Sequence, residues 1–168
     1  MTQYQQLPPD GDIPASRQHL QYCAQENIFK HAISSDFGGH GDGFHELISA
    51  HLSLGKYCQD TGLILSINAH LWGSIFPLII YGSEQQKEIW LPALLSAELI
   101  GGHAITEPQT GSDINAIETH AIPTEAGFLL NGHKRFITNT PIADVLLIYA
   151  KLEGKLSAFL IKKTDSGA

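Results

Sequence analysis

The stretch GHAITEPQTGSD occupies residues 102–113, and the stretch NGHKRFITN occupies residues 131–139. The first predicts a turn-rich polar loop that leaves a short apolar strand, and the second predicts a strand that re-enters after an Asn-Gly turn. Together they supply hydroxyls, backbone N–H groups and one aromatic ring with little charge. Such a set favours a flat cofactor with polar edges over a metal ion or a nucleic acid.

The spacing of hydrophobic residues is typical of helices in the first half of the chain and of strands in the second half, which contains these two segments. The predicted helices cover residues 18–26, 44–58 and 63–80. The predicted strands cover residues 100–106, 117–122, 128–130 paired with 136–138, 145–150 and 156–161, and the last two are expected to be joined near Glu153-Gly154. Helices followed by strands indicate an α+β chain, with an all-α helical domain at residues 1–99 and an antiparallel, incomplete β-domain at residues 100–168.

Local signals set the expected limits of the helices. Ser16 is a predicted cap for the first helix, and Pro77 predicts a kink or break in the apolar one. Ser83 and Gln86 have the spacing of a capping box. Pro92 is expected to begin a further short helix.

The composition excludes several classes of function. The chain has 168 residues, 43% of them hydrophobic and 16% charged, which is typical of a globular protein. Its formal net charge of −7 argues against nucleic acid as a partner. No signal peptide is recognisable, Cys23 and Cys58 lack metal or redox spacing, and a cytoplasmic protein is expected. Residues 63–81 are apolar enough to span a membrane, but polar interruptions favour buried helices.

Two stretches imitate motifs without completing them. Residues 38–43 read GGHGDG but lack the third glycine of a dinucleotide-binding turn, so a plain loop is predicted. Residues 45–49 read HELIS, with Ser49 where a zinc protease has its second histidine. No metal site is predicted, and His45, His51 and His70 are expected to pack or to form hydrogen bonds.

The polar segments allow both a functional and an ordinary interpretation. Gly111 lets the backbone approach a ligand, and the hydroxyl of Ser112 can donate a hydrogen bond to it. Phe136 and Thr138 share one face of the predicted strand, where a ring and a hydroxyl can cover and hydrogen-bond a flat cofactor with polar edges. The same residues are compatible with a simple turn and with a core phenylalanine beside a surface threonine.

The order of ITEPxxGSD and LNGxKxFITN resembles the acyl-CoA dehydrogenase family of flavoproteins. The stretches DFGG at residues 36–39 and YGSEQQK at residues 81–87 extend the resemblance into the first half. The family has an N-terminal helical domain, a middle β-domain and a C-terminal four-helix domain, and this chain is similar to the first two. Many members have tryptophan where Phe136 stands.

The resemblance implies FAD as the cofactor and α,β-dehydrogenation of an acyl thioester, carried by coenzyme A or by an acyl carrier protein. The cofactor-binding residues that it implies are His103, Ile105, Thr106, Gly111, Ser112, Phe136, Ile137 and Thr138, with Ser112 also near substrate. The family's catalytic glutamate lies in the C-terminal domain, and no residue here matches it. Glu107 and Asp113 are expected to be loop residues and not the proton acceptor.

The implied partners are further copies of the chain or a C-terminal partner chain, and an electron-transfer acceptor. Two other readings stay open. The chain can be a non-catalytic remnant or interaction module of the same fold, or it can belong to a flavin oxidase or monooxygenase of that fold.

Overall fold

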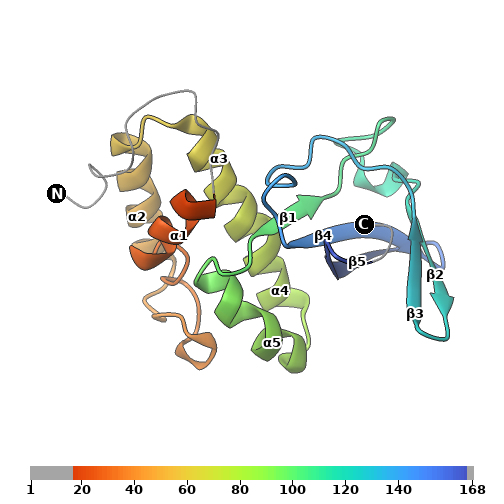
Figure 1. Ribbon diagram of the computed structural model, residues 1–168, viewed down its shortest axis with the longest axis horizontal. Helices are drawn as coiled ribbons and strands as arrows, with labels where there is room; N and C mark the ends of the chain where they lie inside the picture. The colour runs from red at the N-terminus through yellow and green to blue at the C-terminus, as the bar shows by residue number, and fades with distance from the viewer. Residues whose placement is uncertain (1–16, 166–168) are drawn as a thin grey trace.

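The computed structural model describes residues 17–165, in which a group of helices lies beside a sheet (Figure 1). The helices are α1 (Arg17–Gln25), α2 (Phe44–Tyr57), α3 (Thr61–His70), α4 (Phe76–Tyr81) and α5 (Glu84–Leu95), with 3-10 turns η1 (Ser35–Phe37) and η3 (Ile114–Ala116) and a π turn η2 (Leu71–Ile75). The strands are β1 (Gly101–Ala104), β2 (His120–Thr124), β3 (Gly127–Asn131), β4 (Val145–Leu152) and β5 (Lys155–Lys162). The predicted α+β class is confirmed.

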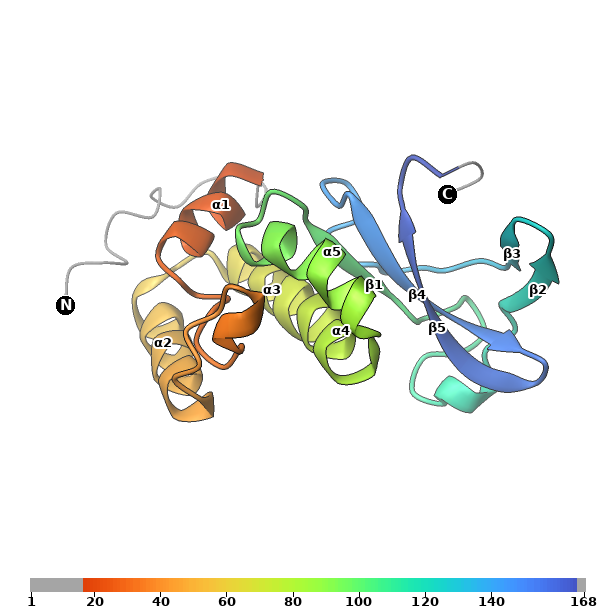
Figure 2. The same cartoon turned by 90° about the horizontal axis from the view of Figure 1, so that it is seen from below.

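A long helix made of α3, η2 and α4 runs through the helical half, with α5 packed beside it (Figure 2). The expected break near Pro77 is replaced by the π turn η2, which ends directly before α4. Pro77 itself lies in the first turn of α4, where a missing N–H is tolerated. Residues 63–80 therefore form one helix with a widened turn and not a pair.

The helix Thr61–Tyr81 is also the one helix of the described chain that is long and apolar enough to cross a membrane, with a mean hydropathy of 1.7. Its apolar side lies in the core, because Leu63, Ile67, Leu71 and Ile75 are at most 1% exposed. Burial of these side chains explains the composition without a bilayer.

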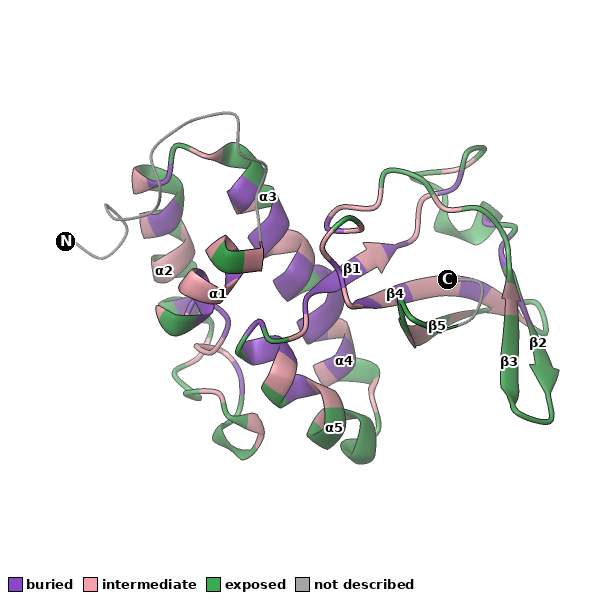
Figure 3. Ribbon diagram, in the orientation of Figure 1, coloured by how far each residue is buried: buried purple, intermediate pink, exposed green. Residues whose placement is uncertain are grey.

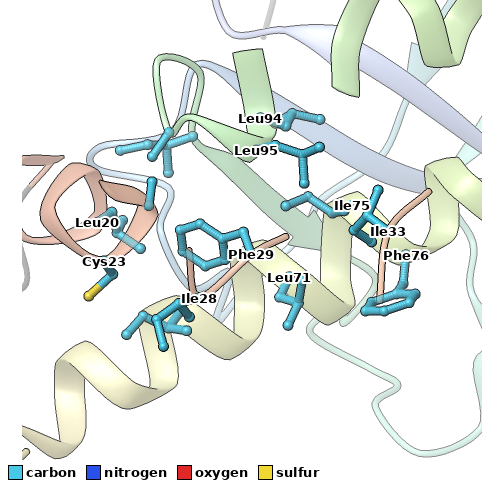
Figure 4. Packing of buried hydrophobic residues seen from close by; sticks show 14 of the residues in the cluster. Leu20, Cys23, Ile28, Phe29, Ile33, Leu71, Ile75, Phe76, Leu94 and Leu95 are labelled. Atoms are coloured by element: carbon cyan, nitrogen blue, oxygen red, sulfur yellow. The ribbon is translucent and has the colours of Figure 1, made fainter. Parts of the chain in front are cut away.

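The core of the helical half is formed by aliphatic and aromatic side chains from all five helices and from the turns between them. Figure 4 shows Leu20 and Cys23 of α1, Leu71 and Ile75 of η2, and Leu94 of α5 converging. Burial follows the same division in Figure 3, where the inner helix faces are buried and β2 and β3 are largely exposed. Cys23 and Cys58 are both buried, and burial raises the pKa of Cys23 to about 12.

Two predictions about helix ends have different outcomes. The Ser83–Gln86 capping box is present, with Ser83 Oγ accepting from Gln86 N at 3.2 Å and Gln86 Oε1 accepting from Ser83 N at 2.9 Å. The separate helix expected from Pro92 is wrong, because α5 continues through that residue to Leu95. The carbonyl that Pro92 leaves unpaired belongs to Glu88, an exposed residue where water can replace the bond. The cap expected at Ser16 lies outside the described residues.

The sheet is mixed, which corrects the antiparallel expectation. One edge of β4 pairs in parallel first with β1, Gly101 opposite Val145, and then with β2, His120 opposite Lys151. The other edge of β4 pairs antiparallel with β5, and β2 pairs antiparallel with β3. The loop at residues 105–119 leaves the sheet between β1 and β2 without reversing the chain, so both strands run in the direction of β4.

The hairpin predicted at Asn131-Gly132 is wrong. β3 instead turns back from β2 at residues 125–126, and residues 132–139 leave the sheet. The backbone of Gly132 lies so close to Thr119 that a Cβ would overlap its side chain, so this glycine serves a close approach and not a turn. The hairpin predicted at Glu153-Gly154 is present between β4 and β5, and both of its residues have positive φ.

Candidate cofactor-binding site

The two polar segments of the second half lie side by side, although the predicted hairpin does not exist. Arg135 N donates to Thr106 O at 3.0 Å, so residues 132–138 run along the loop that follows β1. Lys134 Nζ donates to Ile105 O at 3.0 Å and to Glu107 Oε1 at 2.8 Å. Main-chain and side-chain bonds together hold the segments against each other.

Glu107 is the centre of this arrangement. It is 2% exposed, and its carboxylate accepts from Glu118 N at 2.6 Å, from Thr119 N at 2.9 Å, from the Thr119 hydroxyl and from Lys134. Burial alone raises the pKa of Glu107, but the bonds from Glu118, Lys134 and Thr119 outweigh it and lower the pKa to about 2. Glu107 is therefore an ionised structural group, which supports the expectation that it is not the proton acceptor.

The loop after Glu107 is closed by short-range bonds and ends in exposed residues. Glu107 N donates to Thr110 O at 2.9 Å, and Thr110 Oγ1 donates to Asp113 O at 2.8 Å. The Asp113 side chain caps η3 by accepting from Asn115 N at 3.1 Å, so its position also has a structural explanation. Gly111 and Ser112 are exposed at the tip of the loop.

Phe136 does not lie on a strand, which corrects the expectation that it shares a strand face with Thr138. It occupies a loop, is 78% exposed and has a φ of 57°, a conformation that costs energy for an aromatic residue. The Arg135 guanidinium lies 4.1 Å from its ring centre. Ile137 and Thr138 are half-buried in the same loop. A large ring held exposed in a strained backbone is typical of a ligand contact.

Asn139 anchors this loop to the rest of the molecule, a role that sequence reasoning missed. It is buried, with a φ of 71°, and its Nδ2 donates to Ser66 O at 3.0 Å and to Gly101 O at 3.2 Å. Its Oδ1 accepts from Ser66 Oγ at 2.5 Å. The bonds join α3, β1 and the loop. The available signal was the last letter of FITN, because asparagine tolerates positive φ better than most residues.

His70 makes a second buried connection between helix and sheet. It is 0% exposed, its Nδ1 accepts from Gly101 N at 2.9 Å, and its Nε2 lies 2.9 Å from Leu94 O. The ring must therefore be neutral and carry its proton on Nε2. Burial lowers the pKa of His70 to about 4, in agreement with this tautomer. The expectation that His70 packs and forms hydrogen bonds is confirmed.

His103 lies on β1 with its side chain against the helices. A Cβ added to Gly73 of η2 would lie 2.5 Å from His103 Cβ, and the imidazole packs edge-to-face on Tyr149 with ring centres 5.2 Å apart. Burial lowers the pKa of His103, and its Nε2 has no hydrogen-bond partner among the residues that the structure describes. Its imidazole is therefore neutral. His103 lies two residues before the polar loop, which begins where β1 ends.

The family follows from comparison with known proteins. Residues 3–98 match the family model "Acyl-CoA dehydrogenase, N-terminal domain" and residues 102–168 match "Acyl-CoA dehydrogenase, middle domain". The helices correspond to the N-terminal domain of this flavoprotein family. The mixed sheet, with the polar loop held by the buried Glu107 carboxylate, corresponds to its middle domain. The chain belongs to the acyl-CoA dehydrogenase family.

Among curated relatives, an L-prolyl-[peptidyl-carrier protein] dehydrogenase of Serratia sp. is 43% identical over 140 residues, 80% of this chain and 36% of that protein. A probable acyl-CoA dehydrogenase of Bacillus subtilis is 39% identical over 138 residues, 80% of this chain and 23% of that protein. The chain thus spans less than half the length of these relatives.

Among solved structures, the prolyl acyl carrier protein oxidase AnaB has a TM-score of 0.87 at 36% identity, over 92% of this chain and 42% of AnaB. PigA with FAD and proline has a TM-score of 0.87 at 39% identity, with the same two coverages. The expectation of an FAD-dependent family is confirmed by these relatives.

Proposed function

We propose that this chain contributes the FAD-binding part of an enzyme that oxidises an acyl thioester between Cα and Cβ. The observation that carries the proposal is the bond network between Glu107 and Lys134, which holds residues 105–113 against residues 132–138. This network places hydroxyls, backbone N–H groups and an exposed aromatic ring on adjacent backbone segments. The family membership and the FAD complex of PigA support it.

The proposed FAD contacts are on these segments and on β1. They are His103, Ile105, Thr106, Gly111, Ser112, Phe136, Ile137 and Thr138, with Ser112 also placed near substrate. All eight are half-buried or exposed, so a ligand can reach them. An added Cβ at Gly111 would have one neighbour within 4 Å, Thr106 Cγ2 at 3.9 Å, which leaves room for a ligand. Bound FAD would supply the two-electron acceptor of the reaction.

The proton acceptor must come from another part of the enzyme. Glu107 is excluded because its carboxylate is buried and already accepts five hydrogen bonds, the fifth from Gln109 Nε2 at 2.9 Å, and Asp113 is engaged in capping η3. A general base must reach the proton that it removes. We place the base on polypeptide outside the described residues, in a further domain or in a partner chain.

The proposed substrate is a thioester of coenzyme A or of a carrier protein. A prolyl thioester on a carrier protein is the specific second candidate, because the Serratia relative has this name and AnaB is a prolyl acyl carrier protein oxidase. In both cases the reaction removes hydrogen next to a thioester carbonyl, whose polarisation makes the neighbouring proton acidic.

The wider setting is part of the same proposal. The division between the helical domain and the β-domain falls between residues 99 and 100, the protein acts in the cytoplasm, and it assembles with further copies or with a C-terminal partner chain. A separate electron-transfer acceptor reoxidises the flavin. The apolar side chains exposed on β2 and β3, including Ile122, Phe128 and Leu129, support association through the sheet.

The test is a flavin titration of the purified chain, alone and after mixing with the part of the Serratia relative that lies beyond the matched region. We expect visible flavin absorbance that co-elutes with protein, and bleaching under anaerobic conditions by acyl-CoA or by prolyl-carrier protein. Bound flavin that no thioester bleaches would favour the interaction module. Rapid oxygen consumption during turnover would favour the oxidase reading. Absence of FAD binding both by the chain alone and by the mixture would refute the proposal.

A further inference from the structure

The connection between α1 and α2 lies on the helical half of the molecule (Figure 1). Three metal-ligating side chains meet in this connection. His31 Nδ1 lies 2.9 Å from Asp42 Oδ2, and His40 Nδ1 lies 3.8 Å from the same oxygen. The two imidazole rings are 5.7 Å apart and nearly perpendicular. One ligand atom of each residue lies within 4.8 Å of the others. None of the three belongs to the proposed cofactor site.

The backbone fixes this cluster independently of any ion. His40 N donates to Lys30 O at 2.9 Å, Gly41 N to Ile33 O at 2.8 Å and Gly43 N to His31 O at 3.3 Å. These bonds hold residues 40–43 against residues 30–33 as a small loop clamp. The backbone of Gly39 touches that of Ile33 so closely that a Cβ would overlap it, so only glycine permits the clamp. The ligand atoms are therefore brought together before a ligand arrives.

We propose that His31, His40 and Asp42 form a binding site for a divalent transition-metal ion of the zinc class. Two imidazole nitrogens and one carboxylate oxygen suit zinc, cobalt or nickel, whereas magnesium and calcium prefer oxygen ligands alone. Bonds of about 2.1 Å in a tetrahedral zinc site separate the ligand atoms by about 3.4 Å. The observed spacings of 2.9 and 3.8 Å bracket that value, so small side-chain rotations suffice.

The ion takes the place of the hydrogen bond between His31 and Asp42 and adds His40 to the connection. The three residues come from the two sides of the clamp, so the ion links the chain after α1 to the start of α2. The partly exposed cluster leaves a fourth position for water. Bound ion stabilises the folded chain by an amount that grows with the logarithm of the ion concentration once this exceeds the dissociation constant.

The experiment is a zinc titration by calorimetry on the chelator-treated chain, with cobalt absorbance as a second readout. We expect one ion per chain, and an affinity at least about tenfold weaker in each of His31→Ala, His40→Asn and Asp42→Asn. His40→Asn is the decisive variant, because its ring forms no hydrogen bond in the clamp and the fold should be kept. Circular dichroism verifies that each variant is folded.

The matched control is His45→Ala, which removes an exposed histidine beside Glu46, 3.3 Å away, in a pair without a third ligand. Zinc affinity in this variant should equal that of the parent chain. Absence of a one-to-one zinc complex would overturn the proposal. An equal loss in His45→Ala, or an unchanged affinity in His40→Asn or Asp42→Asn, would overturn it as well.

Discussion

The base and the tip of the candidate cofactor site differ in how their polar groups are satisfied. The loop base, defined here as Glu107, Thr119 and Lys134, contains a buried carboxylate that accepts five hydrogen bonds, one of them from Gln109. The loop tip, defined as Gly111, Ser112 and Phe136, is exposed and includes a strained backbone. A satisfied buried charge maintains structure, whereas an exposed ring in an unfavourable conformation is available for binding. Changes at the base should therefore alter stability, and changes at the tip should alter affinity.

The largest expected effect is at the base. Lys134→Met leaves the Glu107 carboxylate buried without its cation, and loss of one partner of a buried pair costs about 3–5 kcal/mol. The free energy of unfolding, measured by urea denaturation, should fall by this amount. The matched control is the double variant Glu107→Gln with Lys134→Met, which should lose less than the sum of the single variants. A loss below about 1 kcal/mol in Lys134→Met would contradict a structural ion pair.

The pH dependence of stability should also depend on the loop base, through Glu107. Glu107 has a folded pKa of about 2, below its ordinary value of 4.5, so its stabilisation is complete above pH 4.5 and is lost as the pH falls toward 2. The full difference corresponds to about 3 kcal/mol. Urea midpoints measured across this range should decline in the parent chain and decline less in Glu107→Gln. Parallel curves for the two proteins would show that another carboxyl is responsible.

Titration of His70 should change stability in a separate pH range, above that of Glu107. Its pKa is lowered from 6.5 to about 4, so the unfolded chain takes up a proton before the folded chain does. Stability should therefore fall as the pH drops from 6.5 to 4, before the loss due to Glu107 is complete. Replacement His70→Gln should reduce this slope, to which His51 and His103 also contribute because burial lowers their pKa values. The proton uptake on unfolding at pH 5 can be measured by calorimetry in several buffers. An unchanged uptake would assign the slope to a different histidine.

Asn139 gives a smaller effect at the junction between base and helices. Asn139→Ala removes three buried hydrogen bonds and retains the positive φ, which should cost about 2–3 kcal/mol of unfolding free energy. Asn139→Gly separates the two causes, because glycine accepts the backbone conformation and loses only the bonds. Equal stability of the glycine variant and the parent chain would mean that the bonds contribute nothing.

The sequence predicted what depends on local periodicity and failed where distant segments decide. The helices predicted at residues 18–26, 44–58 and 63–80, the capping box at Ser83 and the turn at Glu153-Gly154 depend on neighbouring residues and are present, whereas the separate helix expected at Pro92 is not. The Asn131-Gly132 dipeptide has the same turn preference, but contact with Thr119 and the pairing of β2 with β3 determine the local structure instead. The parallel pairing of β1 and β2 with one edge of β4 cannot be recognised from neighbouring residues in the sequence.

The candidate site shows the same limit. Its chemistry-bearing residues could be named from the two polar segments, and their contacts with FAD stay a prediction. Lys134 and Asn139 stood in the quoted motif without an assigned role, because their partners lie 27 and 73 positions away along the chain. Sequence patterns locate polar groups, whereas only the fold reveals which of them satisfy each other and which stay available.

The smallest expected effect on stability is at the tip, and it should come with a large effect on binding. Phe136→Gly removes an exposed ring and relieves a positive φ, so the unfolding free energy should stay within about 1 kcal/mol of the parent or rise. FAD affinity, measured by flavin fluorescence in the assembled protein, should fall by at least about tenfold if the ring contacts the cofactor. Phe136→Trp is the matched control and should retain binding. A glycine variant that binds FAD as tightly as the parent would show that the exposed ring does not contact the cofactor. The loop tip would then have no demonstrated role in binding to set against the role of the loop base in stability.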